Sequence, residues 1–120
     1  MIGSAPAGLA AEAQSDIGKL KAQMNDTRNR IAVETRKSFQ DIRRAESARD
    51  VAKLDLELSR EQVTVLLAQL DEGRTTRQAV EEARFLEQEK WLAYFDGQHT
   101  VEKAKLSLLR QTGTLLAALR

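Results

Sequence analysis

The feature that most constrains this chain is a single glycine between two long runs of helix-forming sequence. Gly73 is the only glycine between Gly18 and Gly97, and no proline interrupts the runs on either side of it. Glycine adopts the left-handed conformation that ends many helices at little steric cost. Thr75, followed three residues later by Gln78, fits the capping box that begins a new helix. A helix end followed at once by a helix start predicts an αα-hairpin.

The alternative is a glycine within one continuous helix, which costs about 1 kcal/mol relative to alanine. The coincidence of stop and start signals favours the turn. We therefore expect an all-α fold, a long antiparallel α-helical hairpin of the coiled-coil kind with its turn at Gly73. Its predicted parts are a flexible N-terminus or cloning remnant at 1–8, a descending helix at 9–71, a tip turn at 72–75, a return helix at 76–112 and a short helical tail at 113–120.

Composition supports long exposed helices and excludes several classes of function. The chain has 120 residues, of which 31% are charged and only 4% are aromatic, so it forms one domain or less. The net charge is +1 with acids and bases interspersed, which gives no electrostatic case for nucleic acid or an anionic membrane surface. There is no cysteine, hence no disulfide and no thiolate chemistry.

The N-terminus and the apolar stretches argue against membrane insertion of this segment. No signal peptide is recognised, and no apolar run approaches the ~20 residues that span a bilayer. We expect a soluble segment with no membrane contact of its own.

The descending helix carries a coiled-coil seam that changes phase near Phe39. The first part follows 3-4 spacing at Ile17, Leu20, Met24, Thr27 and Ile31. The second part, the central seam, continues at Ile42, Ala45, Arg49, Ala52, Leu56, Ser59, Val63, Leu66 and Leu70. The return helix is shorter than the descending one, so the first part overhangs. We expect another copy or a missing segment to cover it.

A second apolar stripe runs beside the central seam and predicts additional neighbours. Its members are Val51, Leu54, Leu58, Val65 and Ala68. The combined face is too wide for a single two-helix contact, so we expect oligomerisation or further chain. We assign the oligomer face to Val51, Leu54, Leu58 and Val65.

The return helix offers a broader set of inward candidates. These are Ala79, Val80, Ala83, Leu86, Trp91, Tyr94, Phe95, Val101, Ala104, Leu106, Leu108 and Leu109. Gly97 permits a close helix approach or a small bend, and Gly113 marks a stop or a kink.

The sequence shows no constellation for catalysis or for binding a metal or cofactor. His99 is the only histidine, and a metal site or catalytic triad needs several convergent groups. Glu81 and Glu82 are adjacent on a helix and do not face each other. We predict that the protein is not an enzyme and that it has no catalytic, cofactor-binding or metal-binding residues.

Four blocks in order resemble the C-terminal helical arm of TolC-like outer-membrane efflux proteins. They are Arg36-Lys37-Ser38-Phe39-Gln40-Asp41-Ile42, Asp71-Glu72-Gly73-Arg74-Thr75-Thr76, Glu82-Ala83-Arg84, and the stretch from Tyr94 to Leu115 that closes on Leu109-Arg110-Gln111-Thr112-Gly113-Thr114-Leu115. The resemblance covers roughly residues 14 to 116. Family members are trimers whose helices form a periplasmic α-barrel below an outer-membrane β-barrel.

The resemblance implies a role for the tip and for one acid. Gly73, Arg74, Thr75 and Thr76 would contact a periplasmic adaptor, or membrane fusion protein, that couples the duct to an inner-membrane pump. Glu82 would lie near the pore constriction, where a ring of carboxylates favours cations. The chain would then be the periplasmic portion of an outer-membrane protein of a Gram-negative cell envelope, exporting small molecules as part of an α-barrel wall.

The sequence departs from this family in lacking β-strands and a first structural repeat, so by itself it forms no channel. The alternative function is a soluble coiled-coil hairpin that self-associates into a four-helix bundle and serves as a scaffold or binding module.

Overall fold

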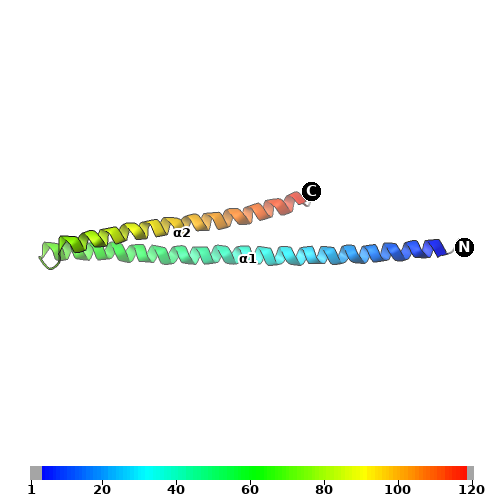
Figure 1. Cartoon of the computed structure of the whole chain (residues 1–120), viewed down its shortest axis with the longest axis horizontal. Helices are drawn as coiled ribbons and strands as arrows, with labels where there is room; N and C mark the ends of the chain where they lie inside the picture. Colours follow the sequence, from blue (N-terminus) through cyan, green and yellow to red (C-terminus); the bar gives the residue numbers. More distant parts are fainter. Residues whose placement is uncertain (1–3, 119–120) are drawn as a thin grey trace. The chain divides into compact units, whose positions relative to one another are not determined.

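The computed structural model describes residues 4–118, and within that range it contains two helices and no strand (Figure 1). Helix α1 spans Ser4–Asp71 and helix α2 spans Arg77–Ala118. The chain divides into two compact units, residues 1–37 and residues 38–120. The second unit pairs the C-terminal part of α1 with α2, which confirms the predicted all-α helical hairpin.

Helix α1 begins earlier than the sequence analysis predicts. It starts at Ser4, so the described part of the expected flexible N-terminus is helical, whereas residues 1–3 lie outside the described residues. Pro6 does not prevent a helix here, because it lies in the first turn. The first turn of any helix has N–H groups without an intrahelical partner, so a residue that lacks an N–H is tolerated there.

Within the first unit, the predicted N-terminal seam is open to solvent. Ile17, Leu20 and Met24 all expose about half of their surface. Neither helix contains a stretch long and apolar enough to cross a membrane within the described residues.

The hairpin unit confirms the central seam on α1. Ile42, Ala45, Leu56, Ser59 and Val63 are buried. The remaining predicted positions, Arg49, Ala52, Leu66 and Leu70, are half-buried. The 3-4 spacing therefore identified the face of α1 that packs against α2.

The matching seam on α2 corrects part of the predicted inward face. Its buried or half-buried positions follow strict 3-4 spacing at Val80, Ala83, Glu87, Lys90, Tyr94, Gly97, Val101, Ala104 and Leu108. The predicted positions Ala79 and Trp91 are also half-buried. By contrast, Leu86, Phe95, Leu106 and Leu109 are exposed, so their predicted inward role is wrong. The buried seam combines Ile, Leu and Val side chains with small ones such as Ala45, Ser59 and Ala83, and it leaves several large apolar residues of α2 exposed.

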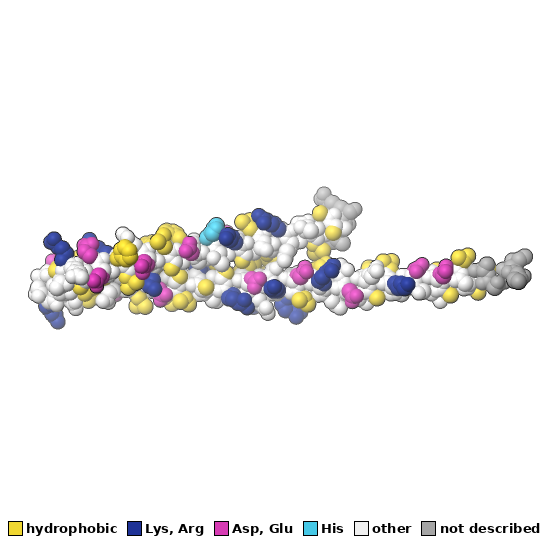
Figure 2. All heavy atoms as spheres, viewed as in Figure 1, with side chains coloured by type: hydrophobic (Ala, Val, Ile, Leu, Met, Phe, Trp, Pro, Cys, Tyr) yellow, Lys and Arg dark blue, Asp and Glu magenta, His cyan; other side chains and the backbone are white. Residues whose placement is uncertain are grey.

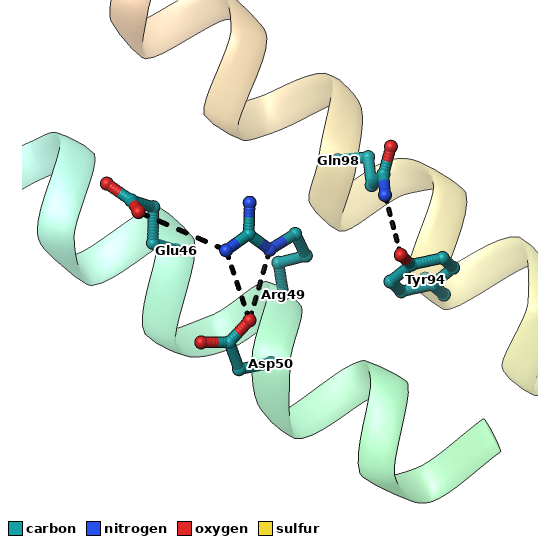
Figure 3. A network of polar contacts seen from close by, with 5 residues as sticks. All are labelled: Glu46, Arg49, Asp50, Tyr94 and Gln98. Carbon is teal, nitrogen blue, oxygen red and sulfur yellow. Dashed lines mark hydrogen bonds and ion pairs between the residues drawn. The ribbon is translucent and has the colours of Figure 1, made fainter. Parts of the chain in front are cut away.

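The backbones of the two helices approach each other closely at Gly97. A Cβ atom added to Gly97 would lie 3.2 Å from the Cα of Arg49. This confirms the prediction that Gly97 permits close packing. The Arg49 guanidinium pairs with acids of its own helix: Nη2 lies 3.1 Å from Oδ1 of Asp50 and 4.0 Å from Oε2 of Glu46 (Figure 3).

Helix α2 also continues beyond its predicted end. It passes through Gly113 to Ala118, so the predicted division between a return helix ending at residue 112 and a separate tail is wrong for the described residues. A helical glycine costs only about 1 kcal/mol relative to alanine, which the surrounding good helix formers offset. Near this end of α2, Ser38 Oγ donates a hydrogen bond to Oε1 of Gln111 over 2.6 Å.

Candidate functional site

The tip of the hairpin is a fully formed helix C-cap. The N–H of Gly73 donates to the carbonyl of Leu70 over 3.0 Å, and the N–H of Arg74 donates to the carbonyl of Gln69 over 2.8 Å. Gly73 has a φ of 71°, the left-handed conformation that this pair of bonds requires. Together these features make a Schellman motif, which satisfies carbonyls at the end of α1 and reverses the chain.

The cap of α2 lies one residue later than predicted. Thr76 Oγ1 accepts a hydrogen bond from the N–H of Ala79 over 3.2 Å, and the Thr76 carbonyl accepts one from the N–H of Val80 over 3.3 Å. Thr76 is therefore the N-cap, and the predicted capping box of Thr75 with Gln78 is wrong.

The four residues predicted to contact an adaptor lie together in this turn. Gly73, Arg74 and Thr76 are exposed, and Thr75 is half-buried. Arg74 Nη1 lies 3.1 Å from Oε2 of Glu72, so the tip presents a paired positive and negative group to solvent. The turn is short, and hydrogen bonds cap the helix end on each side of it, so the backbone that carries these side chains has a defined conformation.

Glu82 lies near the start of α2 with its carboxylate exposed. Its Oε1 accepts a hydrogen bond of 3.3 Å from Nε2 of Gln78, one helical turn earlier. A solvent-exposed carboxylate of this kind can face an aqueous channel if neighbouring chains form one, and the predicted pore-lining role of Glu82 stays a prediction.

The outer side of α1 carries an apolar strip that we call the α1 edge. It comprises Val51, Leu54, Leu58, Val65 and Ala68. The four larger residues, which are the predicted oligomer face, expose between 43% and 70% of their surface. The described chain therefore leaves this face free to contact another molecule.

The outer side of α2 carries a second strip, the α2 edge, which the sequence analysis missed as a surface. It comprises Phe85, Leu92, Phe95, Leu106, Leu109 and Leu116, which expose between 53% and 66% of their surface. These positions fit one 3-4 pattern from Phe85 to Leu116 in which Gln88, His99, Glu102 and Gly113 fill the other places. That spacing is the signal that could have revealed the edge from the sequence.

The two edges lie on opposite outer sides of the hairpin. At 3.6 residues per turn, the α1 edge lies roughly 160° around its helix from the central seam, and the α2 edge lies roughly 150° from the corresponding seam. Because the two seams face each other, the edges face away from each other. Figure 2 shows hydrophobic side chains along the outer margins of both helices in the hairpin.

The aromatic cluster on α2 is a packing feature of the same hairpin. Trp91 stacks on Phe95 with 5.5 Å between ring centroids, and the Arg60 guanidinium of α1 lies 5.4 Å from the Trp91 ring centroid. Arg60 Nε also lies 3.9 Å from Oε1 of Glu87, which occupies the α2 seam. These contacts join the two helices through a cation and an aromatic face.

Among residues 4–118, no group of three or more histidine, cysteine, aspartate or glutamate side chains is arranged to hold a metal ion. Comparison with protein-family models, with curated proteins and with solved structures finds no match for this chain. The resemblance to TolC-like proteins therefore rests on the sequence blocks given above.

Proposed function

We propose that this hairpin is a wall segment of a TolC-like outer-membrane efflux duct. In this role its helices pack side by side with neighbouring helices in a periplasmic α-barrel, and its tip docks on a periplasmic adaptor that connects to an inner-membrane pump. The mechanism is mechanical and electrostatic, with no bond made or broken by the chain. The export of small molecules is a property of the complete duct.

The observation that carries this proposal is the placement of the two apolar edges. A helix in the wall of an α-barrel has a neighbour on each flank, so it needs two apolar strips on opposite sides. Both helices of the hairpin have this arrangement: each has its buried seam on one side and its exposed edge on the other. The pattern supports packing at both flanks of the hairpin.

The same placement argues against the alternative of a four-helix bundle scaffold. Two hairpins that stack face to face must present their apolar surfaces on one common face. The α1 edge and the α2 edge point outward in opposite directions instead. A face-to-face bundle would leave both edges in water.

The tip supports the docking part of the proposal. Its Schellman motif and N-cap hold Arg74 and Glu72 at the end of the hairpin, away from both edges. A docking contact at this place would leave the flanks free for the wall. Under the same proposal, Glu82 from several chains contributes carboxylates to the pore and favours cations.

Binding to an adaptor tests this role directly. The purified chain would be measured by biolayer interferometry against immobilised periplasmic adaptors of TolC-like efflux systems. The test variant is Arg74→Glu, which reverses an exposed charge at the tip. The matched control is Arg84→Glu, since Arg84 is also exposed and also lies near an acid close in sequence: Arg84 pairs with Glu81 within α2, as Arg74 pairs with Glu72 in the turn.

We expect the unmodified chain and Arg84→Glu to bind alike and Arg74→Glu to bind at least about tenfold more weakly, as for loss of a charge contact at an interface. Absence of adaptor binding by the unmodified chain, or equal losses for the two variants, would contradict docking through the tip.

A further inference from the structure

We propose that copies of this chain bind one another edge to edge, with the α1 edge of one copy against the α2 edge of the next, stepped by two heptads along the hairpin. The inference uses only the two edges and not the tip. It therefore stands independently of adaptor docking.

Both edges have the periodicity that a coiled coil requires. The α1 edge places apolar residues at 51, 54, 58, 65 and 68, and the α2 edge follows the same 3-4 spacing. When neighbouring hairpins point the same way, the α1 edge of one copy runs antiparallel to the α2 edge of the next. The remaining variable in the contact is the register, which is the position of one edge along the other.

A flush register fits poorly. In the hairpin Arg49 lies level with Gly97, so flush neighbours would place Val51 against Phe95. Leu58 would then face Gln88, and Glu61 would face Phe85. This register buries polar groups against apolar side chains at the centre of the contact, which is unfavourable.

A shift of two heptads improves these pairings. In this register Val51 faces Leu109, Leu54 faces Leu106, Val65 faces Phe95, Ala68 faces Leu92, Glu61 faces His99 and Leu58 faces Glu102. Four layers are apolar on both sides, and one joins an acid to a histidine. Along the α1 edge, from residue 51 to residue 68, the single mismatched layer is that of Leu58. Leu116 and Phe85 lie at the two ends of the contact, opposite Arg44 and Thr75.

The charges that flank the edges select the same register. Asp55 lies beside Lys103 of the neighbouring copy, and Glu57 lies beside Lys105. In antiparallel coiled coils these flanking positions pair across the contact. Exposed ion pairs add little affinity, but they discriminate strongly between alternative registers.

The occupant of each edge is therefore a second copy of this chain. The contact joins different surfaces on the two partners, so each copy still offers one free edge and the assembly can grow. Two heptads correspond to a step of roughly 21 Å between copies. A duct with level tips would cover the same edges with helices of other chains, so the stepped assembly is the state of the chain outside a duct. Failure of self-pairing would leave the duct proposal open.

Disulfide trapping tests the register. The chain has no cysteine, so single cysteines can be introduced without background. A tagged Leu54→Cys chain would be mixed with an untagged Leu106→Cys chain, or with Leu92→Cys, which faces residue 54 in the flush register. All three positions are exposed, and circular dichroism would verify the helix content.

We expect the mixed disulfide between Leu54→Cys and Leu106→Cys to form faster than the one with Leu92→Cys, and faster than either homodimer. Faster trapping with Leu92→Cys, or dominance of the homodimers, would overturn the stepped register.

Complementation tests that the contact joins two different edges. One variant carries Val51→Gln and Leu54→Gln, and the other carries Leu106→Gln and Leu109→Gln, both in a background in which Leu20→Gln and Met24→Gln block the exposed N-terminal seam. These changes remove the two sides of the same apolar layers, and loss of two buried apolar side chains weakens association by at least about 100-fold, so each variant alone should sediment as a monomer.

An equal mixture of the two variants should form a one-to-one dimer, because one partner retains an intact α2 edge and the other an intact α1 edge. A mixture that remains monomeric, or a single variant that still associates as strongly as the unmutated background, would refute the proposal.

Discussion

Gly97 faces Arg49 so closely that a Cβ atom at Gly97 would lie 3.2 Å from the Arg49 Cα. The neighbouring atom belongs to the backbone of α1, so it cannot move away as a flexible side chain would. This pair sets the separation of the two helices at the middle of the hairpin.

Enlarging Gly97 should therefore destabilise the hairpin. We expect Gly97→Leu to lower the free energy of unfolding by about 1–3 kcal/mol, because the added side chain forces the helices apart. Gly113→Ala is the matched control. Nothing lies within 4 Å of a Cβ at Gly113, so the change should stabilise α2 by about 0.5–1 kcal/mol through helix propensity. Urea unfolding followed by circular dichroism, at equal protein concentrations, measures both effects.

The N-cap gives a prediction that separates two adjacent threonines. Thr76→Val removes the hydroxyl that accepts a hydrogen bond from Ala79 and should cost about 1 kcal/mol of stability. Thr75→Val has the same shape change but leaves that cap intact, so it should cost clearly less. Equal losses in thermal unfolding would show that Thr75 shares the capping role.

The left-handed backbone at Gly73 predicts a strong preference at the tip. Gly73→Val should destabilise the chain by about 1–2 kcal/mol, since a β-branched residue is strained at positive φ. Gly73→Asn should cost less, because asparagine tolerates this conformation. Chemical unfolding of the two variants would rank them, and a valine variant as stable as the asparagine one would argue against a rigid turn.

Ser59 predicts that the seam requires small residues more than it requires a hydroxyl. Ser59 is only 6% exposed, and its Oγ donates to the carbonyl of Leu56 on its own helix over 2.8 Å. Ser59→Ala should change stability by less than about 0.5 kcal/mol, because alanine is the better helix former. Ser59→Leu should destabilise by about 1–3 kcal/mol through overpacking, whereas Ser107→Leu at an exposed site should have little effect. Thermal melts of the three variants test this order.

The sequence predicted the hairpin and the α1 seam because both depend on local patterns. Gly73 supplied the stop signal, and 3-4 spacing through Leu56 and Val63 identified the packed face. The same reasoning failed on α2, where it selected large apolar residues such as Leu106 and Leu109. The α2 seam instead mixes small residues such as Ala83 and Gly97 with Val80 and Val101, so side-chain size did not mark the contact. On α2 the seam and the edge are two different 3-4 patterns, so grouping the residues by pattern would have divided the predicted inward residues into two strips.

The finer errors have local physical causes. Thr75 and Thr76 both have capping side chains, and only the hydrogen bond from the Ala79 N–H, which the sequence does not reveal, identifies Thr76 as the cap. Gly113 has the residue type of a helix end, but its backbone stays helical and α2 continues to Ala118. Pro6 has the residue type of a helix breaker, but it lies in the first turn, where its missing N–H has no consequence.

The narrow seam also has a consequence for the life of the chain in a cell. Within the described residues only seven apolar side chains are buried, while the edges stay in water, so a solitary hairpin gains limited stability from its own folding. Partners that cover the edges stabilise the folded form by mass action. Copies without partners open more often and are cleaved by proteases, so degradation would adjust the amount of this chain to the supply of its neighbours.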